Sequence, residues 1–245
     1  MLSIIIPTLN EEEGIAKVIC SIPEKYKKES EIIVVDASND YTPIIAEKLG
    51  VKVIKEKTRG KGLQMRKGVE ASHGDVLIFL DGDGTDPPQY IPKLLKKLKI
   101  ANLVLGCRSM KSFEADDHRM RNIFKFYGVF MRPIFGLMDF RTSDPLAGFR
   151  AIRRRDWDKL NLKSKGFEIE TEMNIRALQE NFIIKEVYIP NLKRCGGLKK
   201  SKFLNDRKSW LKISKIILDY LKEKNSKSKI KKFKKIKSDF GTKLK

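Results

Sequence analysis

Short apolar runs alternate with stretches of helical character over the first 107 residues, and this alternation limits the possible folds more than any other feature. The runs are rich in Ile, Val and Leu, and they occupy residues 2–7, 31–36, 51–55, 76–81 and 103–106. Strands that alternate with helices form a parallel sheet covered by helices on both faces. We therefore predict an α/β fold: a single domain with a mainly parallel central sheet.

The pattern of apolar residues predicts further elements outside these runs. We expect a helix at 61–71, a second helix at 167–180, a strand at 183–189 and a C-terminal amphipathic helix at 206–222. Near the N-terminus, Asn10 is followed three residues later by Glu13, which is the spacing of a capping box. This pattern predicts that a helix is capped by Asn10.

Two carboxylates, Asp81 and Asp83, follow the apolar run at 76–80 and are separated only by Gly82. In an open α/β sheet, ligands bind at the carboxyl ends of the strands. Carboxylate oxygens are suitable ligands for a hard divalent cation, and two of them can hold Mg²⁺ against the phosphates of a substrate. The sequence therefore predicts a site for a metal–nucleotide complex at this strand end.

The chain carries 52 Lys and Arg residues against 31 Asp and Glu residues, a formal net charge of +21. This excess indicates an anionic partner (nucleic acid, a phosphate-rich ligand or an acidic membrane), although a lysine-rich proteome would give the same composition. A nucleic-acid-binding surface would interleave basic with exposed aromatic residues. Most of the excess lies instead in the C-terminal half, and residues 222–245 hold eleven lysines against two acids. We expect a basic tail at 223–245, an anionic membrane surface as its partner, and no nucleic-acid partner.

Three widely spaced cysteines and only two histidines predict neither a disulfide framework nor a histidine-based metal site. No apolar run approaches the ~20 residues that cross a bilayer, and the N-terminus lacks the basic region of a signal peptide. The stretches 121–138 and 206–222 combine apolar residues with basic flanks, as interfacial helices do. We expect a cytoplasmic protein that is peripheral on the cytoplasmic face of the membrane.

Six motifs, taken together and in order, resemble those of family-2 glycosyltransferases with the GT-A fold. They are Pro7-Thr-Leu-Asn-Glu-Glu12, Ile33-Val-Val-Asp36, Arg59-Gly-Lys-Gly62, Phe79-Leu-Asp-Gly-Asp-Gly-Thr-Asp-Pro-Pro88, Asp144-Pro-Leu-Ala-Gly-Phe-Arg150 and Arg194-Cys-Gly-Gly. The chain looks most like the dolichyl-phosphate mannose and glucose synthases, without the C-terminal membrane helices of some members. The likeness covers residues 1–222 and implies a nucleotide-sugar-binding half at 1–107 and an acceptor-binding half at 108–222.

The resemblance implies an inverting glycosyltransferase that moves a hexose from UDP-glucose or GDP-mannose to dolichyl or another polyprenyl phosphate. It also implies roles for the matching residues. The candidate ligands of Mg²⁺ or Mn²⁺ are Asp81, Asp83 and Thr85. The candidate contacts of the nucleotide sugar are Pro7, Asn10, Glu11, Asp36, Lys61, Asp81 and Lys202. The candidate catalytic residues are Asp83, Arg108 beside the acceptor phosphate, and Arg194 beside the departing diphosphate.

The chain departs from the family pattern at two of these positions. Thr85 stands where lipid-phosphate mannose synthases often have Gln, and the segment from Asp36 to Asp40 is one residue shorter than usual. The second departure leaves the base of the donor, uracil or guanine, open. Lys61 lies between two glycines, whose lack of a side chain would let the backbone approach the nucleotide closely.

The chemistry of the acceptor leaves two versions of this function open. A sugar hydroxyl needs a general base to attack an anomeric carbon, whereas a lipid phosphate is already an anion near neutral pH. Glu168, Glu170 and Glu172 lie where related enzymes carry acids, but the helix dipole also favours acids in a first turn. A glycan or a small hydroxylated molecule therefore stays possible as the acceptor. A sugar nucleotidyltransferase is disfavoured, because the residues after the first strand are not rich in glycine and arginine.

Overall fold

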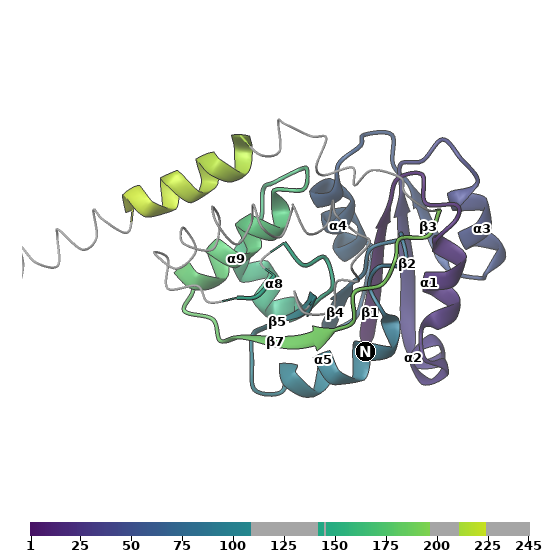
Figure 1. Cartoon of the computed structure of the whole chain (residues 1–245), viewed down its shortest axis with the longest axis horizontal. Helices are drawn as coiled ribbons and strands as arrows, with labels where there is room; N and C mark the ends of the chain where they lie inside the picture. Colours follow the sequence, from purple (N-terminus) through teal and green to yellow (C-terminus); the bar gives the residue numbers. More distant parts are fainter. Residues whose placement is uncertain (109–141, 145, 197–210, 224–245) are drawn as a thin grey trace, which may run out of the picture.

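The structure is a computed structural model, and it describes residues 1–108, 142–144, 146–196 and 211–223. In this part of the chain seven strands form one sheet in the order β3-β2-β1-β4-β6-β5-β7 (Figure 1). The strands are β1 Leu2–Thr8, β2 Ser30–Asp36, β3 Lys52–Lys55, β4 Val76–Phe79, β5 Leu103–Arg108, β6 Arg150–Arg153 and β7 Ile184–Ile189. All neighbours pair in parallel except β6, which runs antiparallel to β4 and β5. The predicted α/β fold with a mainly parallel sheet is confirmed.

Helices cover both faces of the sheet (Figure 1). They are α1 Ile15–Ser21, α2 Glu24–Glu29, α3 Thr42–Lys48, α4 Lys61–Glu70, the 3₁₀ turn η1 Pro88–Tyr90, α5 Ile91–Leu98, α8 Arg154–Leu160 and α9 Ile169–Gln179. Successive side chains of a strand point to opposite faces. Ile5 of β1 accordingly packs in the core under α4, α8 and α9, whereas its neighbours Ile4 and Ile6 pack under α1 and α5. Two apolar layers therefore hold the strands rigidly and fix the positions of the loops that follow them.

The capping role predicted for Asn10 is wrong. Helix α1 begins at Ile15, and Gly14 is its N-cap without a side-chain cap hydrogen bond. The amide of Asn10 donates to Oγ of Ser38 over 2.7 Å, and its Oδ1 accepts from the amide of Asn39 over 2.9 Å. Asn10 has a φ of 54°, so it forms a turn that joins the loop after β1 to the loop after β2.

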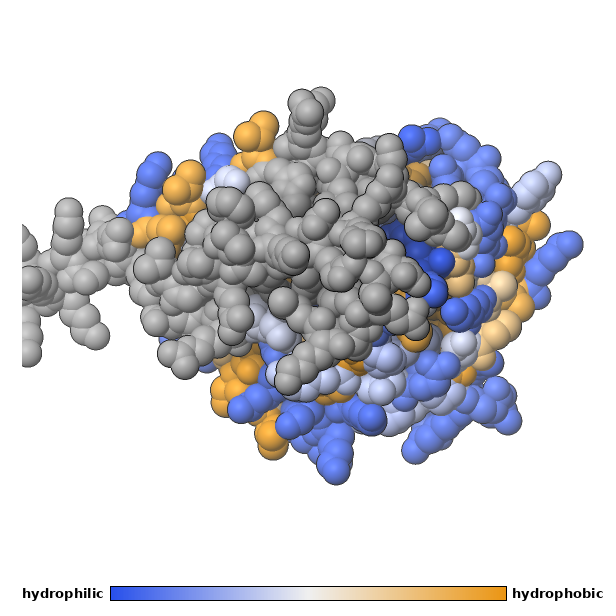
Figure 2. All heavy atoms as spheres, in the orientation of Figure 1, coloured by the Kyte–Doolittle hydropathy of each residue, from blue (hydrophilic) through white to orange (hydrophobic). Residues whose placement is uncertain are grey.

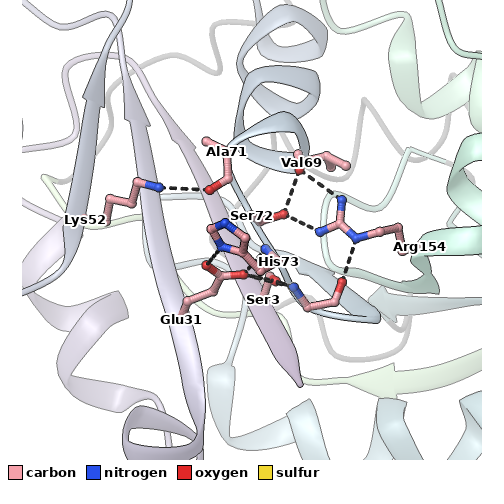
Figure 3. Close-up of polar contacts among 9 residues, drawn as sticks. Ser3, Glu31, Lys52, Val69, Ala71, Ser72, His73 and Arg154 are labelled. Carbon is pink, nitrogen blue, oxygen red and sulfur yellow. Dashed lines mark hydrogen bonds and ion pairs between the residues drawn. The ribbon is translucent and has the colours of Figure 1, made fainter.

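A partly buried polar cluster lies at the edge of the sheet where the parallel strands begin (Figure 3). Glu31 accepts hydrogen bonds from Oγ of Ser3 over 2.6 Å, from the amide of Gly74 over 3.0 Å and from the amide of His73. Burial raises the pKa of Glu31, but the hydrogen bonds from Ser3 and His73 outweigh it and lower the pKa to about 2. The ionised carboxylate therefore fastens the chain that leads into β4.

Arg154, the first residue of α8, completes this cluster from the other side (Figure 3). Its guanidinium donates to the carbonyl oxygen of Val69 over 3.1 Å, to Oγ of Ser72 over 2.7 Å and to the carbonyl oxygen of Gly74 over 2.8 Å. The end of α4 and the start of β4 are thereby tied to α8.

Residues 211–223 form a helix that packs against the core through Ile213 and Ile217. Leu211 and Leu218, on its outer side, are 72% and 55% exposed, and orange side chains stand out among blue ones over this helix (Figure 2). These residues lie within the amphipathic helix predicted at 206–222, which as a whole stays a prediction. Residues 206–210, the stretch 121–138 and the tail beyond 223 lie outside the described residues. Among the described helices, none is both long and apolar enough to cross a membrane.

Candidate active site

The acidic motifs of the sequence meet at the opposite edge of the sheet, where the parallel strands end. β1 pairs in parallel with both β2 and β4, so the three strands end side by side. Asp36 is the last residue of β2, and Asp81 lies two residues beyond the end of β4. The structure thus brings together acids that the sequence places 45 residues apart.

The loop after β4 is folded by its own acidic side chains. The amide of Asp81 donates to Oδ2 of Asp86 over 3.0 Å. Oδ1 of Asp83 accepts from the amide and from the hydroxyl of Thr85, over 2.9 and 2.6 Å. Gly84 has a φ of 79°, a conformation that glycine adopts without strain and that closes the turn. Thr85 therefore orients Asp83 in this structure.

The side chain of Arg194, in the segment after β7, contacts Asp83. Nη2 of Arg194 lies 2.5 Å from Oδ2 of Asp83, and Nη1 lies 3.7 Å from Oε1 of Glu11. The amide of Cys195 donates to the carbonyl oxygen of Asp83 over 2.9 Å. Three sequence-predicted site residues, Glu11, Asp83 and Arg194, are thus in one cluster.

Asp81 contacts a different cationic side chain, that of Lys61. Nζ of Lys61 lies 2.5 Å from Oδ1 of Asp81 and 2.6 Å from Oε1 of Glu170. Burial disfavours the charges, but the contacts with two carboxylates raise the pKa of Lys61, and the lysine in turn lowers the pKa of Asp81. Burial is the main cause of a raised pKa at Glu170. The site therefore contains an ammonium shared between two acids.

Glycines place Lys61 in this position, for a reason that the sequence did not reveal. The amides of Gly62 and Leu63 donate to the carbonyl oxygens of Gly166 and Lys165, over 3.2 and 3.0 Å. A Cβ on Gly60 would lie 2.3 Å from the carbonyl oxygen of Lys165, closer than atoms can approach. The glycines that flank Lys61 thus allow α4 to contact the chain before α9. Lys61 is the first residue of α4, so the helix predicted at 61–71 is confirmed.

Gly148 lies against the other side of Asp81. A Cβ on Gly148 would come within 2.6 Å of Oδ2 of Asp81 and within 2.9 Å of its Oδ1. The glycine in the motif at 144–150 therefore leaves the space that this carboxylate occupies.

The three glutamates around the start of α9 have different surroundings. Glu172 accepts hydrogen bonds from the amides of Lys163 and Ser164 and so holds the preceding loop. Glu168 contacts Nζ of Lys212 over 3.2 Å. Only Glu170, of these three, contacts a residue that touches Asp81.

Asp36, like the acids in the loop after β4, is fixed by hydrogen bonds. Its Oδ1 accepts from the hydroxyls of Thr8 and Ser38 over 2.7 and 2.5 Å, and its Oδ2 accepts from the amide of Ser38 over 3.0 Å. Gln64 of α4, which sequence reasoning missed, donates to the carbonyl oxygens of Thr8 and Val35 over 2.7 Å each. Its burial and its contacts with two strand ends are visible only in the tertiary structure.

The remaining N-terminal candidates lie in or beside the same loops. Pro7 is opposite Val35 in the pairing of β1 with β2, and the amide of Glu11 donates to Oγ1 of Thr42 over 2.8 Å. Asn10 is in the turn described above. Lys202 lies outside the described residues.

Arg108, at the end of β5, is paired with an acid. Its Nε lies 2.7 Å from Oδ2 of Asp144, and although burial opposes the charge, this contact raises the pKa of Arg108. Arg150 is fully buried nearby, where it donates to the carbonyl oxygen of Ala147 and to Oδ1 of Asn174, over 2.7 and 2.8 Å. Burial lowers the pKa of Arg150. Its position behind the site was not predicted, because its strand neighbours gave no sign of a buried charge.

Asp86 is a further acid of this site that sequence reasoning left unassigned. Burial and the negative charge of Asp81 raise the pKa of Asp86 to about 8. Asp86 therefore keeps its proton more readily than an exposed aspartate does.

Comparisons with known proteins agree with this geometry. Residues 3–160 match the glycosyl transferase family 2. The chain belongs to this family. A dolichyl-phosphate hexose transferase of Haloferax volcanii is 30% identical over 221 residues, which are 89% of this chain and 94% of the relative. A dolichol-phosphate mannosyltransferase of Pyrococcus furiosus is 30% identical over 185 residues, 71% of this chain but only 52% of that longer relative. The protein is therefore a glycosyltransferase.

Solved structures confirm the GT-A fold of this glycosyltransferase. A glucosyl-3-phosphoglycerate synthase of Mycobacterium tuberculosis, in complex with Mn²⁺, UDP and phosphoglyceric acid, matches with a TM-score of 0.72. The match has 21% identity and covers 90% of this chain and 78% of that structure. A mannosyl-3-phosphoglycerate synthase of Rubrobacter xylanophilus matches with a TM-score of 0.68, 18% identity and coverage of 92% and 75%.

The oxygen donors of the glycosyltransferase fit a hard divalent cation that also binds a diphosphate. Within the described residues, no three acid, histidine or cysteine side chains are arranged to hold a metal by themselves. Mg²⁺ usually needs only one or two carboxylates when substrate phosphates complete its coordination, and Asp81 and Asp83 supply two. Each carboxylate already contacts a cationic side chain, Lys61 or Arg194, as expected where acids attract positive charge.

Proposed function

We propose that this glycosyltransferase moves a hexose from a nucleoside-diphosphate sugar, UDP-glucose or GDP-mannose, to dolichyl or another polyprenyl phosphate with inversion at the anomeric carbon. The observation that carries the proposal is the acidic pair Asp81 and Asp83 at the carboxyl end of β4, with Lys61 and Arg194 beside it. This arrangement suits an anionic diphosphate bridged to acids by Mg²⁺ or Mn²⁺.

The chain's own residues would bind and orient the donor. A divalent cation on Asp81 and Asp83, with the Thr85 hydroxyl as a further candidate ligand, would supply Lewis acidity toward the departing diphosphate. Arg194 is near enough to Asp83 to offset negative charge that develops on the same diphosphate. Lys202 would add a second cation there, on the strength of its motif.

The nucleoside would lie along the ends of β1 and β2. Asp36 is fixed there by Thr8 and Ser38 and would accept hydrogen bonds from the ribose or the base. Pro7, Asn10 and Glu11 would line the same part of the donor site. Lys61 would contribute positive charge near the phosphates.

Both chemistry and the names of relatives support a polyprenyl phosphate as the acceptor. A polyprenyl phosphate needs no general base, because its phosphate is already ionised. The relatives from Haloferax and Pyrococcus are named as transferases that use dolichyl or dolichol phosphate. Arg108, held at the end of β5 by Asp144, would bind the acceptor phosphate.

One observation favours the second candidate, a hydroxylated acceptor. Glu170 is a buried carboxylate with a raised pKa, one ammonium away from Asp81, and such a group can act as a general base. With saturating Mn²⁺, Glu170→Gln should abolish transfer to a hydroxyl acceptor but leave transfer to a lipid phosphate measurable.

A panel experiment tests the proposed donor, metal and acceptor together. Purified protein is incubated with radiolabelled UDP-hexoses or GDP-hexoses, Mg²⁺ or Mn²⁺, and dolichyl phosphate, and lipid-linked sugar is extracted into organic solvent. One donor should give a metal-dependent, lipid-soluble product, and EDTA should remove it. A folded protein that labels no lipid with any donor would exclude the proposed acceptor.

The proposed lipid acceptor requires the enzyme to reach a membrane surface. The outward side of helix 211–223 carries Leu211, Lys215, Leu218 and Lys222, and residues 224–245 add ten lysines against one acid. Exposed leucines with lysines suit an interface, and each basic residue near an anionic surface contributes about 1 kcal/mol. We infer that this helix and the basic tail contact the cytoplasmic face of an anionic membrane.

Deletion of residues 225–245 tests this contact. Sedimentation with vesicles of anionic phospholipid should fall strongly, whereas sedimentation with neutral vesicles and donor binding should not change. The matched variant Leu211→Ser with Leu218→Ser should weaken binding further. Undiminished binding of the truncated chain to anionic vesicles would remove the tail's role.

A further inference from the structure

The ammonium of Lys61 contacts the carboxylate of Asp81, which the proposed metal would also need as a ligand. The ammonium is 2.5 Å from Oδ1 of Asp81 and 2.6 Å from Oε1 of Glu170, and the side chain of Lys61 is only 10% exposed. A divalent cation on Asp81 and a buried ammonium on the same carboxylate repel each other, because little water screens them. Binding of the metal and the contact between Lys61 and Asp81 therefore compete.

Glu170 keeps the ammonium of Lys61 paired when a metal binds Asp81. Glu170 is in the first turn of α9 and is buried. Breaking a buried ion pair by removing one partner is costly, because a charge is left without compensation. The carboxylate of Glu170 removes much of this cost, since Lys61 remains paired when it releases Asp81.

The backbone makes Lys61 and Glu170 one unit that is separate from Asp81. Gly62 and Leu63 hydrogen-bond to Gly166 and Lys165, immediately before α9. Asp81 instead follows β4 and is tied to Asp86 of its own loop. A small change in side-chain torsion at Lys61 is thus enough to release Asp81, while the ion pair to Glu170 stays intact.

We propose that Lys61 is a positioning residue that holds Asp81 before the divalent cation binds and is retained by Glu170 afterwards, so that this pair sets the cation affinity of the site. The inference rests on the proposed metal site. It assigns Lys61 a role toward the cation that is separate from any contact with the donor phosphates.

Mn²⁺ binding without substrate tests the proposal, measured as loss of the electron paramagnetic resonance signal of free Mn²⁺. Lys61→Met removes the competitor and should tighten binding at least about fivefold, the lower end of typical coupling between two binding events. Glu170→Gln leaves Lys61 with Asp81 alone and should weaken binding by a similar factor.

The double variant Lys61→Met with Glu170→Gln separates contact from net charge. It removes one positive and one negative charge, so a purely long-range effect predicts unchanged affinity, whereas release of Asp81 predicts tighter binding than in the native chain. Lys67 and Glu56 form an ion pair that also involves α4 but does not contact Asp81, so Lys67→Met with Glu56→Gln is the matched control and should bind Mn²⁺ normally.

The outcomes distinguish this inference from the metal site itself. Asp81→Asn with Asp83→Asn should abolish Mn²⁺ binding, and binding that survives it, or no binding by the native chain, overturns both proposals. If that variant loses Mn²⁺ but Lys61→Met and the double variant bind no more tightly than the native chain, only the role of Lys61 is overturned. Thermal melts verify that each variant is folded.

Discussion

The two edges of the sheet hold their carboxylates in different ways. At the edge where the strands begin, Glu31 accepts from backbone amides and a serine hydroxyl (Figure 3). At the edge where the strands end, Asp81 and Asp83 contact the tips of Lys61 and Arg194. Both arrangements compensate a partly buried negative charge, but the donors differ in their freedom to move.

This difference suggests that the carboxylate at the first edge stabilises the fold, whereas the carboxylates at the second edge serve the reaction. Backbone amides are fixed by the fold, so a carboxylate bound to them stays where it is. Long cationic side chains can change rotamer at modest cost, so the acids that they contact can exchange partners with a metal and a diphosphate. We therefore expect substitutions at the two edges to affect different measurements.

The largest effect is expected from the end of β4. Asp81→Asn with Asp83→Asn should lower hexose transfer by at least about 100-fold, the scale on which loss of preorganised electrostatic groups affects turnover. The melting temperature should change little, because amides keep the size of the acids. Asp75→Asn, at the other edge, is the control and should transfer normally. Equal activity of all three proteins would remove the distinction between the edges.

Glu31→Gln should affect stability and leave Mn²⁺ binding unchanged. The expected loss in unfolding free energy is on the order of 2 kcal/mol, because hydrogen bonds to a charged group are worth about 1.5–3 kcal/mol. The pKa of Glu31 is lowered from 4.5 to about 2, so this contribution is complete above pH 4.5 and is lost as the pH falls toward 2. Urea unfolding across this range measures it, and parallel curves for both proteins would contradict the prediction.

Gly148→Ala sharpens the comparison by moving one carboxylate without changing any charge. The added Cβ would collide with the carboxylate of Asp81, which should swing away. Mn²⁺ affinity should fall about tenfold, equivalent to about 1.4 kcal/mol, while the melting temperature changes little. A large loss of stability with normal Mn²⁺ binding would show that Gly148 serves the fold instead.

The smallest effect is expected at Lys212, whose side chain is 57% exposed. Its contact with Glu168 joins helix 211–223 to the start of α9. Lys212→Met should lower the unfolding free energy by less than about 1 kcal/mol, since Lys212 is exposed although Glu168 is buried, and ion pairs screened by solvent contribute little. A larger loss of unfolding free energy, measured by urea unfolding, would mean that cationic side chains also stabilise the fold near this edge.

Local patterns predicted much of the fold. Runs such as 32–35 and 76–80 are continuous apolar stretches, typical of strands buried on both faces, and the structure has strands there. Asn10 shows the limit: its spacing to Glu13 fits a capping box, but Ser38 and Asn39 are its partners. The antiparallel insertion of β6 between β4 and β5 was also not predicted, because pairing between distant segments has no local signature.

The sequence alone determined the α/β fold and the position of Asp81 and Asp83 after a buried strand, because periodicity and strand ends are properties of neighbouring residues. Only the tertiary structure decided which cation contacts which acid. Lys61, Asp81 and Glu170 come from α4, the loop after β4 and α9, and packing of these elements sets the distances. Electrostatic interactions depend on distance in space and on burial, and neither is written in the order of the residues.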